Sequence, residues 1–287
     1  MVDPVAMGEP PRTTRVAALQ LCATPDVKEN MATAANLVAQ ASAQGAEVAM
    51  LPEAFAFLGP ENLKRDFLER LPATPQGSGG PILERCREIA ESAQCDLVLG
   101  GFHEDYGDPD KCFNTCIHLA ADGSIKASYR KIHMFDVALA DGTQLRESSR
   151  TAAGDQLVTT DLPFGKLGLS ICYDLRFPYL YQGLVDKGAV ALTVPSAFTA
   201  STGPAHWHVL LRARAIECQA YVIAPAQYGH NWGKRNSYGH TLIIDPWGRI
   251  LQQREIGDGV VIADIDPQQV TRVRSELPSL RHRRSLE

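Results

Sequence analysis

Long apolar runs, an excess of basic residues and paired metal ligands are all missing from this 287-residue chain. No apolar run approaches the roughly 18 residues that a membrane-spanning helix requires, so we expect no membrane partner. The formal net charge of −5 gives no reason to expect a nucleic-acid partner. We also expect no metal and no other cofactor, because the nearest cysteines, Cys112 and Cys116, have no second Cys or His pair at ligand spacing.

The cysteines, seven in number, are scattered along the chain. This usage favours reduced thiols and predicts a cytoplasmic location. The first fourteen residues hold three prolines but no apolar stretch behind a basic start, unlike a signal peptide. We therefore predict a flexible leader over residues 1–14. No linker divides the remainder, so residues 15–287 are predicted to form a single domain.

Short apolar runs alternate with amphipathic segments, which is typical of βα units. Asp26 is predicted to cap a helix that stops at Gly45, and Pro81 to begin a second helix. Since both halves of the chain also contain a hairpin signal, we predict an α/β fold with two sheets covered by helices. The predicted strands and hairpin arms are 15–21, 46–51, 95–104, 112–120, 124–131, 165–171, 189–195, 220–227, 240–253 and 260–266; the predicted helices are 26–43, 81–93, 178–187, 204–218 and 267–276.

A candidate nucleophile lies in residues 170–178. An apolar run ends at Cys172, and Pro178 suits the first turn of a following helix, so the thiol is predicted to lie in a strand-to-helix turn. Open α/β sheets place their sites at such strand ends. The backbone N–H groups of Tyr173 and Asp174 would face the same space and could hold an oxyanion. The alternative is that Cys172 is a small buried core residue, which is the commoner role of cysteine.

Two charged residues are also predicted at strand ends. Glu53 follows the apolar run AEVAML, so burial is expected to raise its pKa and suit it to proton transfer; the alternative is a helix cap or an exposed acid. Lys131 could stabilise an oxyanion as a fixed positive charge, or it could be a solvated lysine. We interpret His133 as a packing or hydrogen-bonding residue. Glu147 is either a second acid near the site or a surface residue.

Arg214 falls on the apolar face of the predicted helix 204–218. A buried arginine needs a carboxylate partner. Because Arg and Trp are enriched at subunit interfaces, one interpretation is that this helix lies at an interface. The alternative is that Arg214 snorkels at the edge of the core.

Three local motifs give the chain a family resemblance. LPE at Glu53, YRKIHMF at Lys131 and ICYDLRFP at Cys172 resemble the three signature regions of the nitrilase superfamily, the carbon–nitrogen hydrolases, in the same order and with similarly wide spacing. The resemblance runs from about residue 15 to the end of the chain. It implies a four-layer αββα sandwich. It also implies a likeness of helices 177–187 and 205–218 to those that pair subunits into a homodimer or higher homo-oligomer.

The resemblance also implies roles for individual residues. Glu53, Lys131 and Cys172 would form the catalytic triad. Glu147 aligns with a second glutamate of the family and would orient Lys131 or the substrate. The backbone N–H of Tyr173 would share the oxyanion with Lys131. For a substrate with two carboxylates, we further predict that Arg176 grips one of them and that Thr202 adds a hydroxyl contact.

Within the superfamily, the stretches PSAFTASTGPAHWHVLLRARAIE, SYGHTLIIDPWG and LPSLRHRR look most like the deaminated-glutathione amidases. This branch would cleave a small-molecule amide, deaminated glutathione, to 2-oxoglutarate and Cys-Gly. The alternatives are an ω-amidase that acts on 2-oxoglutaramate, or another aliphatic amidase or N-carbamoyl hydrolase of the same superfamily. A non-enzymatic binding scaffold is the alternative from another functional class. A cysteine peptidase that pairs Cys172 with a histidine of helix 204–218 would lack an evident Asn or Asp to orient that histidine.

Overall fold

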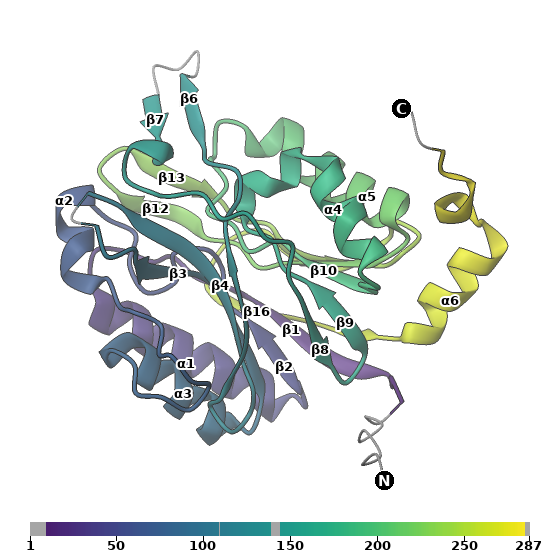
Figure 1. The fold of residues 1–287 in the computed structure, drawn as a ribbon, viewed down its shortest axis with the longest axis horizontal. Coiled ribbons are helices and arrows are strands. Elements are labelled where there is room, and N and C mark those ends of the chain that lie inside the picture. Colours follow the sequence, from purple (N-terminus) through teal and green to yellow (C-terminus); the bar gives the residue numbers. More distant parts are fainter. Residues whose placement is uncertain (1–9, 109, 139–143, 285–287) are drawn as a thin grey trace, which may run out of the picture.

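The computed structural model describes residues 10–108, 110–138 and 144–284. Within these residues the chain forms two six-stranded sheets and two small hairpins (Figure 1). In sheet order, the first sheet is β16 (Gly259–Ile265), β1 (Thr14–Gln20), β2 (Val48–Met50), β3 (Asp96–Asp105), β4 (Cys112–Leu119) and β5 (Ile125–Arg130). The second sheet is β15 (Ile250–Arg254), β14 (Thr241–Ile244), β11 (Tyr221–Ala224), β10 (Ala191–Thr193), β9 (Gly165–Gly168) and β8 (Thr159–Leu162). The hairpins are β6 (Asp136–Ala138) with β7 (Gln144–Arg146), and β12 (Tyr228–Trp232) with β13 (Arg235–Tyr238).

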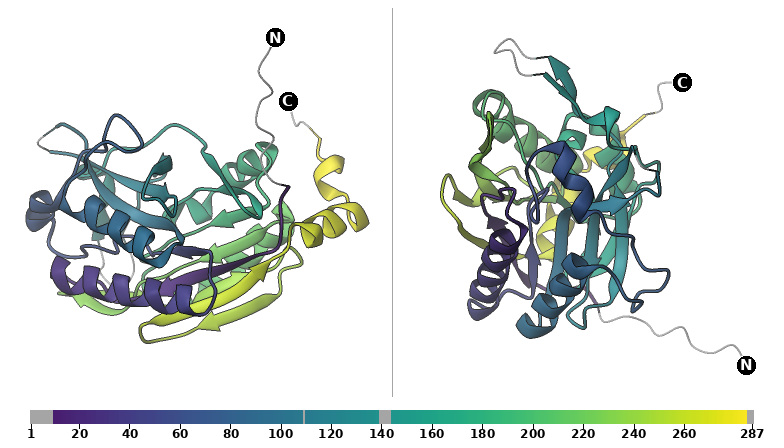
Figure 2. Two further views of the ribbon diagram at one scale, coloured as in Figure 1. Left: turned by 90° about the horizontal axis from the view of Figure 1, so that it is seen from below. Right: turned by 90° about the vertical axis from the view of Figure 1, so that its left-hand side faces the viewer.

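The helices connect and cover these sheets. The α-helices are α1 (Val27–Ala43), α2 (Glu61–Lys64), α3 (Pro81–Ala93), α4 (Pro178–Asp186), α5 (Gly203–Cys218) and α6 (Pro267–Glu276). The 3₁₀ helices are η1 (Arg65–Phe67), η2 (Glu147–Ser149), η3 (Cys172–Arg176) and η4 (Ser279–His282). Helices α1 and α3 lie side by side over the first sheet, whereas α4 and α5 cover the second (Figures 1 and 2).

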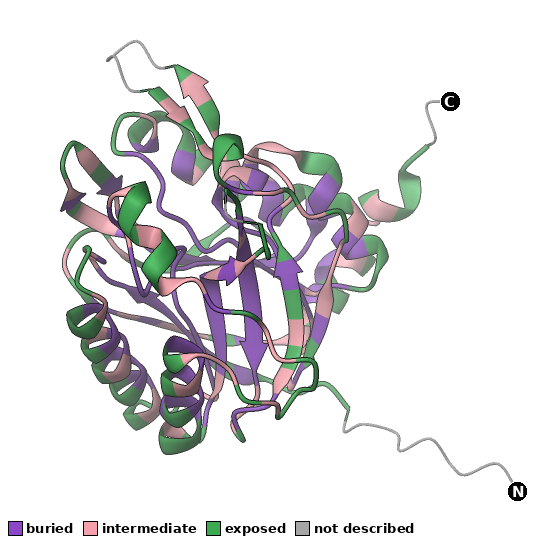
Figure 3. Ribbon diagram, turned by 60° about the vertical axis from the view of Figure 1, so that its left-hand side comes forward, coloured by how far each residue is buried: buried purple, intermediate pink, exposed green. Residues whose placement is uncertain are grey.

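Alternation along β1 shows how the layers are built. Side chains of a strand point alternately to its two faces. Val16 and Ala18 belong to the core that joins the two sheets, whereas Ala17 and Leu19 belong to the core under α1 and α3. Both faces of the strand are therefore apolar, which explains its continuous apolar sequence. The outer faces of α1 and α3 are exposed, while the strands β1, β2 and β3 beneath them are largely buried (Figure 3). The predicted four-layer αββα sandwich is confirmed.

Several helix boundaries follow the predicted signals. The Asp26 side chain accepts a hydrogen bond from the Glu29 N–H, 3.0 Å away, at the start of α1. Gly45, just beyond the end of α1, has φ +83°, a left-handed conformation that glycine adopts without steric cost. Pro81 and Pro178 occupy the first turns of α3 and α4. An N–H at this position would have no acceptor within the helix, so its absence in proline costs no hydrogen bond.

The N-terminal boundary differs slightly from the prediction. Residues 1–9 of the predicted leader lie outside the described residues, but β1 begins at Thr14. Arg12 donates its backbone N–H to Pro163 O at 2.9 Å and its Nη1 to Glu47 Oε1 at 2.9 Å. These contacts fix the chain before β1. Among the described helices, none is both long and apolar enough to cross a membrane.

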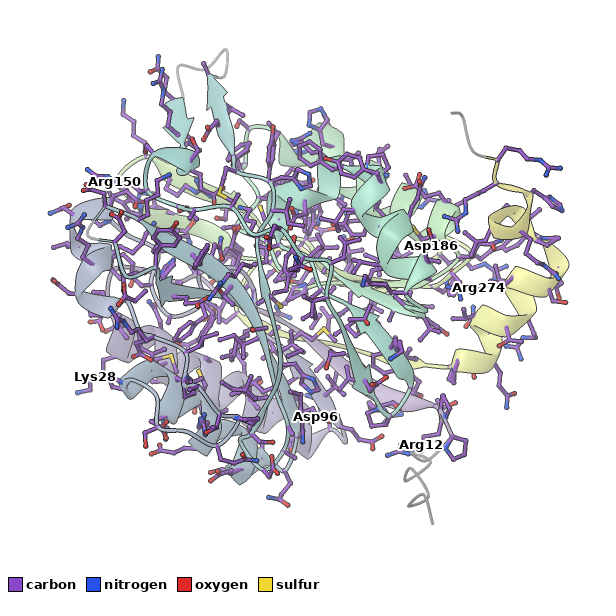
Figure 4. All side chains as sticks on the ribbon, viewed as in Figure 1. Arg12, Lys28, Asp96, Arg150, Asp186 and Arg274 are labelled. Carbon is purple, nitrogen blue, oxygen red and sulfur yellow. The ribbon has the colours of Figure 1, made fainter. Side chains whose placement is uncertain are left out.

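The C-terminal segment extends along the second sheet's side of the molecule. Arg274 on α6 points back toward the body and donates hydrogen bonds to Gln219 O at 3.1 Å and Ala189 O at 2.9 Å (Figure 4). Beyond it, Arg283 forms an ion pair with Asp186 at the end of α4. The basic tail, predicted to be solvated or to contact a partner, thus contacts its own chain as far as it is described.

Candidate active site

Three side chains from different parts of the sequence line one cavity of about 350 Å³. Glu53 follows β2, Lys131 follows β5, and Cys172 begins η3 after β9. All three are buried, and Glu147 at the start of η2 lines the same cavity. The structure therefore brings together the three residues of the predicted triad and the predicted supporting acid.

Lys131 is held by two carboxylates. Its Nζ lies 3.0 Å from Glu53 Oε1, 2.9 Å from Glu147 Oε2 and 3.0 Å from Glu147 Oε1. Its side chain is only 2% exposed. Burial alone would lower the pKa of Lys131, but the charges of Glu147 and Glu53 outweigh it and raise the pKa. Lys131 therefore remains a fixed positive charge, and both carboxylate oxygens of Glu147 contact it.

Glu53 is equally constrained. Its Oε1 also accepts from Asn114 Nδ2 at 2.9 Å, and its Oε2 accepts from the Ala197 N–H at 2.8 Å. Its backbone oxygen accepts from Gln227 Nε2 at 2.9 Å. Burial would raise the pKa of Glu53, as the sequence led us to expect, but the Lys131 charge and the hydrogen bonds lower it to about 2. The predicted direction was wrong, because the strand-end pattern does not show the lysine that lies against the carboxylate.

A pair of glycines lets β3 pass directly beneath Glu53. A Cβ on Gly101 would lie 2.8 Å from Ala54 N, 2.9 Å from Asn114 Oδ1 and 3.0 Å from Glu53 Cα. A Cβ on Gly100 would lie 2.1 Å from Leu51 O. The β3–β4 register shifts between Leu99 and Phe102, so this pair sits at an irregularity in the ladder. Glycine inside a strand often marks such a close backbone approach, a signal that the sequence does contain.

Cys172 has a strained backbone. Its φ is +46°, a left-handed conformation that is costly for a residue with a side chain. Its N–H donates to Pro195 O at 3.0 Å, which ties the turn to the end of β10. Burial raises the pKa of the thiol, the Glu53 charge raises it further, and the Lys131 charge offsets only part of the increase. In the resting site the sulfur is therefore protonated while Glu53 is ionised.

The backbone donors after Cys172 differ from each other. The Asp174 N–H donates to Ile171 O at 3.1 Å, so the prediction that it faces the open site was wrong. The Tyr173 N–H lies in the first turn of η3, where no intrahelical acceptor is available. The role of the Tyr173 N–H as an oxyanion donor stays a prediction.

The Asp174 side chain joins the Cys172 turn to the Lys131 segment. It is fully buried. Its Oδ2 accepts from Ile171 N–H at 2.9 Å and Tyr129 Oη at 2.7 Å; its Oδ1 accepts from the backbone N–H of His133 at 3.1 Å and lies 2.7 Å from His133 Nδ1. We name these residues, Tyr129, His133, Ile171 and Asp174, the Asp174 clasp. His133 is thus a hydrogen-bonding residue, as predicted, and it also stacks on Phe177.

Two predicted substrate contacts lie elsewhere. Neither Arg176 nor Thr202 is among the described residues that line the cavity. Arg176 Nη1 lies 3.3 Å from His206 Nδ1, and its guanidinium carbon lies 5.3 Å from the centroid of the Phe198 ring. Thr202 Oγ1 lies 2.7 Å from the hydroxyl of Thr199. Their substrate-binding roles stay predictions.

Arg214 has the carboxylate partner that its burial requires. Its Nη1 lies 2.6 Å from Glu217 Oε1, and its Nε and Nη2 donate to Leu175 O at 3.1 and 2.8 Å. The guanidinium therefore links α5 to η3, the short helix that carries Cys172.

Several cavity-lining residues were missed by sequence reasoning, among them Asn114, His103 and Arg235. Burial, together with the charge of Lys64, lowers the pKa of His103 to about 3, so this ring is neutral near pH 7. Arg235 begins β13, in a hairpin that our sequence analysis did not predict. Its Nη2 donates to Ala197 O at 2.8 Å. In the described part of the chain, no cluster of His, Cys, Asp and Glu side chains could hold a metal ion.

Comparisons with known proteins identify the family of the chain. The carbon-nitrogen hydrolase family model matches residues 15–275. The chain therefore belongs to the carbon–nitrogen hydrolase family, as the three motifs predicted. A human relative named deaminated glutathione amidase is 43% identical over 273 residues, which cover 94% of this chain and 82% of the relative. A Synechocystis relative of the same name is 44% identical over 270 residues, which cover 93% of this chain and 97% of the relative.

Solved structures show the same fold. The Caenorhabditis elegans NitFhit protein is 37% identical with a TM-score of 0.86, and the match covers 96% of this chain and 66% of that longer protein. Saccharomyces cerevisiae Nit3, described as a member of branch 10 of the nitrilase superfamily, is 31% identical with a TM-score of 0.83. That match covers 93% of this chain and 95% of Nit3. The protein is thus a hydrolase of this superfamily by sequence and by fold.

Proposed function

We propose that this protein is an amidase that hydrolyses deaminated glutathione through a thioester on Cys172. The observation that carries the proposal is the convergence of Cys172, Glu53 and Lys131 on one cavity, with Lys131 ion-paired to Glu53 at 3.0 Å. Such a set combines a nucleophile, a proton acceptor and a fixed positive charge. The choice of deaminated glutathione as the substrate follows from the relatives named deaminated glutathione amidase.

The first half of the reaction forms the thioester. Because Cys172 is protonated and Glu53 is ionised at rest, the thiol proton passes to Glu53 as the sulfur attacks the amide carbonyl carbon. The carbonyl π electrons move to oxygen, where the Lys131 ammonium and the Tyr173 N–H stabilise the negative charge. The C–N bond then breaks, Glu53 returns the proton to the leaving amine, and the acyl group stays on sulfur.

The second half releases the acid. Glu53 takes a proton from water as the water oxygen attacks the thioester carbonyl. The C–S bond breaks, and the departing thiolate recovers the proton held by Glu53. Glu147 keeps the Lys131 ammonium in the same position through both halves, since it bonds Lys131 at 2.9 Å.

For deaminated glutathione the acyl group is the 2-oxoglutaryl group, and the leaving amine is Cys-Gly. A cavity of about 350 Å³ falls in the size range of small-molecule sites. The test compares wild-type and Cys172→Ala protein on deaminated glutathione and on 2-oxoglutaramate. We expect wild-type turnover of the first substrate and none by the variant, with both proteins equally folded by circular dichroism. A strong preference for 2-oxoglutaramate would reassign the chain as an ω-amidase, and full activity of Cys172→Ala would refute the mechanism.

Self-association is part of the proposal. Val209 and Ile216 lie seven residues apart on α5 and are 67% and 48% exposed, and Trp247 is 50% exposed. Large exposed apolar side chains on a helix favour an interface there. Light scattering coupled to size exclusion should give the mass of a homodimer or higher homo-oligomer; a monomer at micromolar concentration would contradict this. The seven free thiols also support the proposed cytoplasmic location, where thiols stay reduced.

A further inference from the structure

The guanidinium of Arg235 is a positive charge at the cavity that neither half of the proposed reaction uses. It lines the cavity together with Glu53, Lys131 and Cys172. Lys131 forms ion pairs with both Glu53 and Glu147, so its charge is fully engaged by those two carboxylates. Among the described residues, no carboxylate forms an ion pair with Arg235. Its guanidinium is therefore available to pair with an anionic group that enters the cavity.

The position of Arg235 is fixed by a single residue, Ala197. Its Nη2 donates to Ala197 O at 2.8 Å, while the N–H of the same Ala197 donates to Glu53 Oε2 at 2.8 Å. One residue thus orients both the proton acceptor and the arginine. The guanidinium is consequently connected to Glu53 through the backbone of Ala197.

The remaining hydrogen-bonding capacity of Arg235 is unsatisfied. Its Nε is buried, and no described residue accepts a hydrogen bond from it. A buried donor without an acceptor is costly, so such groups normally have a partner. Arginine presents its donors as a rigid planar fork that matches a carboxylate. A carboxylate that enters with the substrate would supply both the missing acceptor and an ion-pair partner for the guanidinium.

We infer that Arg235 binds the carboxylate of the acyl half of the substrate, the end of the 2-oxoglutaryl group remote from the scissile amide. This inference rests on the proposed function. The acyl half is favoured over the leaving Cys-Gly because Arg235 is anchored on Ala197, the residue that also holds Glu53. The acyl carboxylate is also the nearer of the substrate's two carboxylates to the scissile carbonyl. Arg235 is accordingly a specificity-determining residue that selects amides of 2-oxo dicarboxylic acids.

The test compares wild type with Arg235→Ala and Arg235→Lys on three substrates. Deaminated glutathione carries both carboxylates, 2-oxoglutaramate carries only the acyl one, and butanamide carries none. We expect Arg235→Ala to lower kcat/KM roughly 10- to 100-fold for the first two, chiefly through KM, because it removes a charge-assisted hydrogen bond. Butanamide hydrolysis, or alkylation of Cys172 by iodoacetamide, should change less than about threefold. Arg235→Lys should recover part of the loss, since it keeps the charge but not the fork.

Other outcomes would overturn the inference. Equal losses on all three substrates and in alkylation would mean that Arg235 only supports Ala197 and Glu53. A loss confined to deaminated glutathione would place Arg235 at the leaving-group end, and no loss at all would remove it from recognition. A selective loss in Arg176→Ala instead of Arg235→Ala would restore the role first predicted for Arg176. Failure of the proposed function is distinguishable, because wild type itself would then turn over neither carboxylate-bearing amide.

Discussion

The two sheets contribute different kinds of group to the site. The first sheet supplies the charges, Glu53 after β2 and Lys131 after β5, which hold each other at 3.0 Å. The second sheet supplies the nucleophile, Cys172, whose position depends on a backbone turn with φ +46°. An ion pair pulls its members back together after a small displacement, whereas a strained turn persists only while its surroundings enforce it. The position of Cys172 therefore depends on contacts from the surrounding structure more than the positions of Glu53 and Lys131 do.

The largest expected effect comes from removing a charge of the first sheet. Glu53→Gln leaves the shape of the site but takes away the acceptor of the thiol proton and of the water proton. We expect a loss of kcat of at least about 10⁴-fold, as for other members of catalytic sets that act together. The measurement is kcat on deaminated glutathione.

A matched control lies at the other end of the same strand. Glu47 precedes β2 and pairs on the surface with Arg12, so Glu47→Gln should retain kcat within about twofold. Near-normal activity of Glu53→Gln would break the assignment of Glu53 as the proton acceptor.

The next effect concerns the support of the second sheet. Asp174→Asn keeps the size of the side chain but replaces one acceptor oxygen of the Asp174 clasp by an N–H₂ group. We expect the Cys172 turn to shift and kcat to fall by about 10²-fold, because small misplacements of a reacting group are that costly. Binding of substrate, read from KM with chemistry rate-limiting, should change far less.

Asp186→Asn, at the exposed end of α4, is the matched control for the clasp. If Asp174→Asn lowers kcat but leaves the melting temperature unchanged, Asp174 has a positioning role. An Asp174→Asn enzyme with wild-type kcat would show that the turn holds itself and would remove the contrast between the sheets.

A smaller effect is expected from a backbone change beside the charges. Gly101→Ala would press a Cβ against Ala54 N and the Glu53 Cα. The ion pair with Lys131 should limit the displacement of the carboxylate, so we expect a kcat loss of only about 10-fold, smaller than that of Asp174→Asn, with roughly 1–3 kcal/mol of lost stability from overpacking. Denaturant unfolding and kcat measure the two effects. A kcat loss that exceeds that of Asp174→Asn would reverse the comparison.

The smallest expected effect is that of moderately acidic pH on kcat/KM. Glu53 is active when ionised, and its folded pKa of about 2 lies below the ordinary value of 4.5. Its ionised form therefore stabilises the fold above about pH 4.5, and this contribution is lost as the pH falls toward 2. We expect kcat/KM to vary less than about threefold between roughly pH 5 and 7. A decline with a midpoint inside that range, seen also with butanamide, would contradict a strongly acidic Glu53.

Much of this arrangement was readable from the sequence. Apolar runs that end in Glu53, Lys131 and Cys172 predicted three strand ends, and three ordered motifs predicted their convergence. The pKa direction of Glu53 was not readable, because it depends on Lys131, which lies far away in the sequence and contacts it only in the fold. For the same reason the Asp174 clasp was missed: its members lie about 40 residues apart along the chain, in two elements that pack together.

The lining of the cavity was the least predictable part of the site. Arg176 stands close to Cys172 in the sequence, but its guanidinium turns toward His206 and the Phe198 ring. Arg235 lies in a short hairpin with no strong periodicity, and it reaches the cavity through its bond to Ala197 O. Proximity in sequence to the nucleophile therefore does not place Arg176 among the cavity-lining residues, because tertiary packing sets the direction of its side chain.

The central claim is that the sulfur of Cys172 carries the acyl group during turnover. Mass spectrometry of enzyme mixed rapidly with deaminated glutathione and quenched in acid tests it directly. The account predicts a mass increase of one 2-oxoglutaryl group, located by peptide mapping on Cys172 and absent from Cys172→Ala. Steady turnover with no adduct under conditions that slow deacylation, or an adduct on another residue, would contradict it.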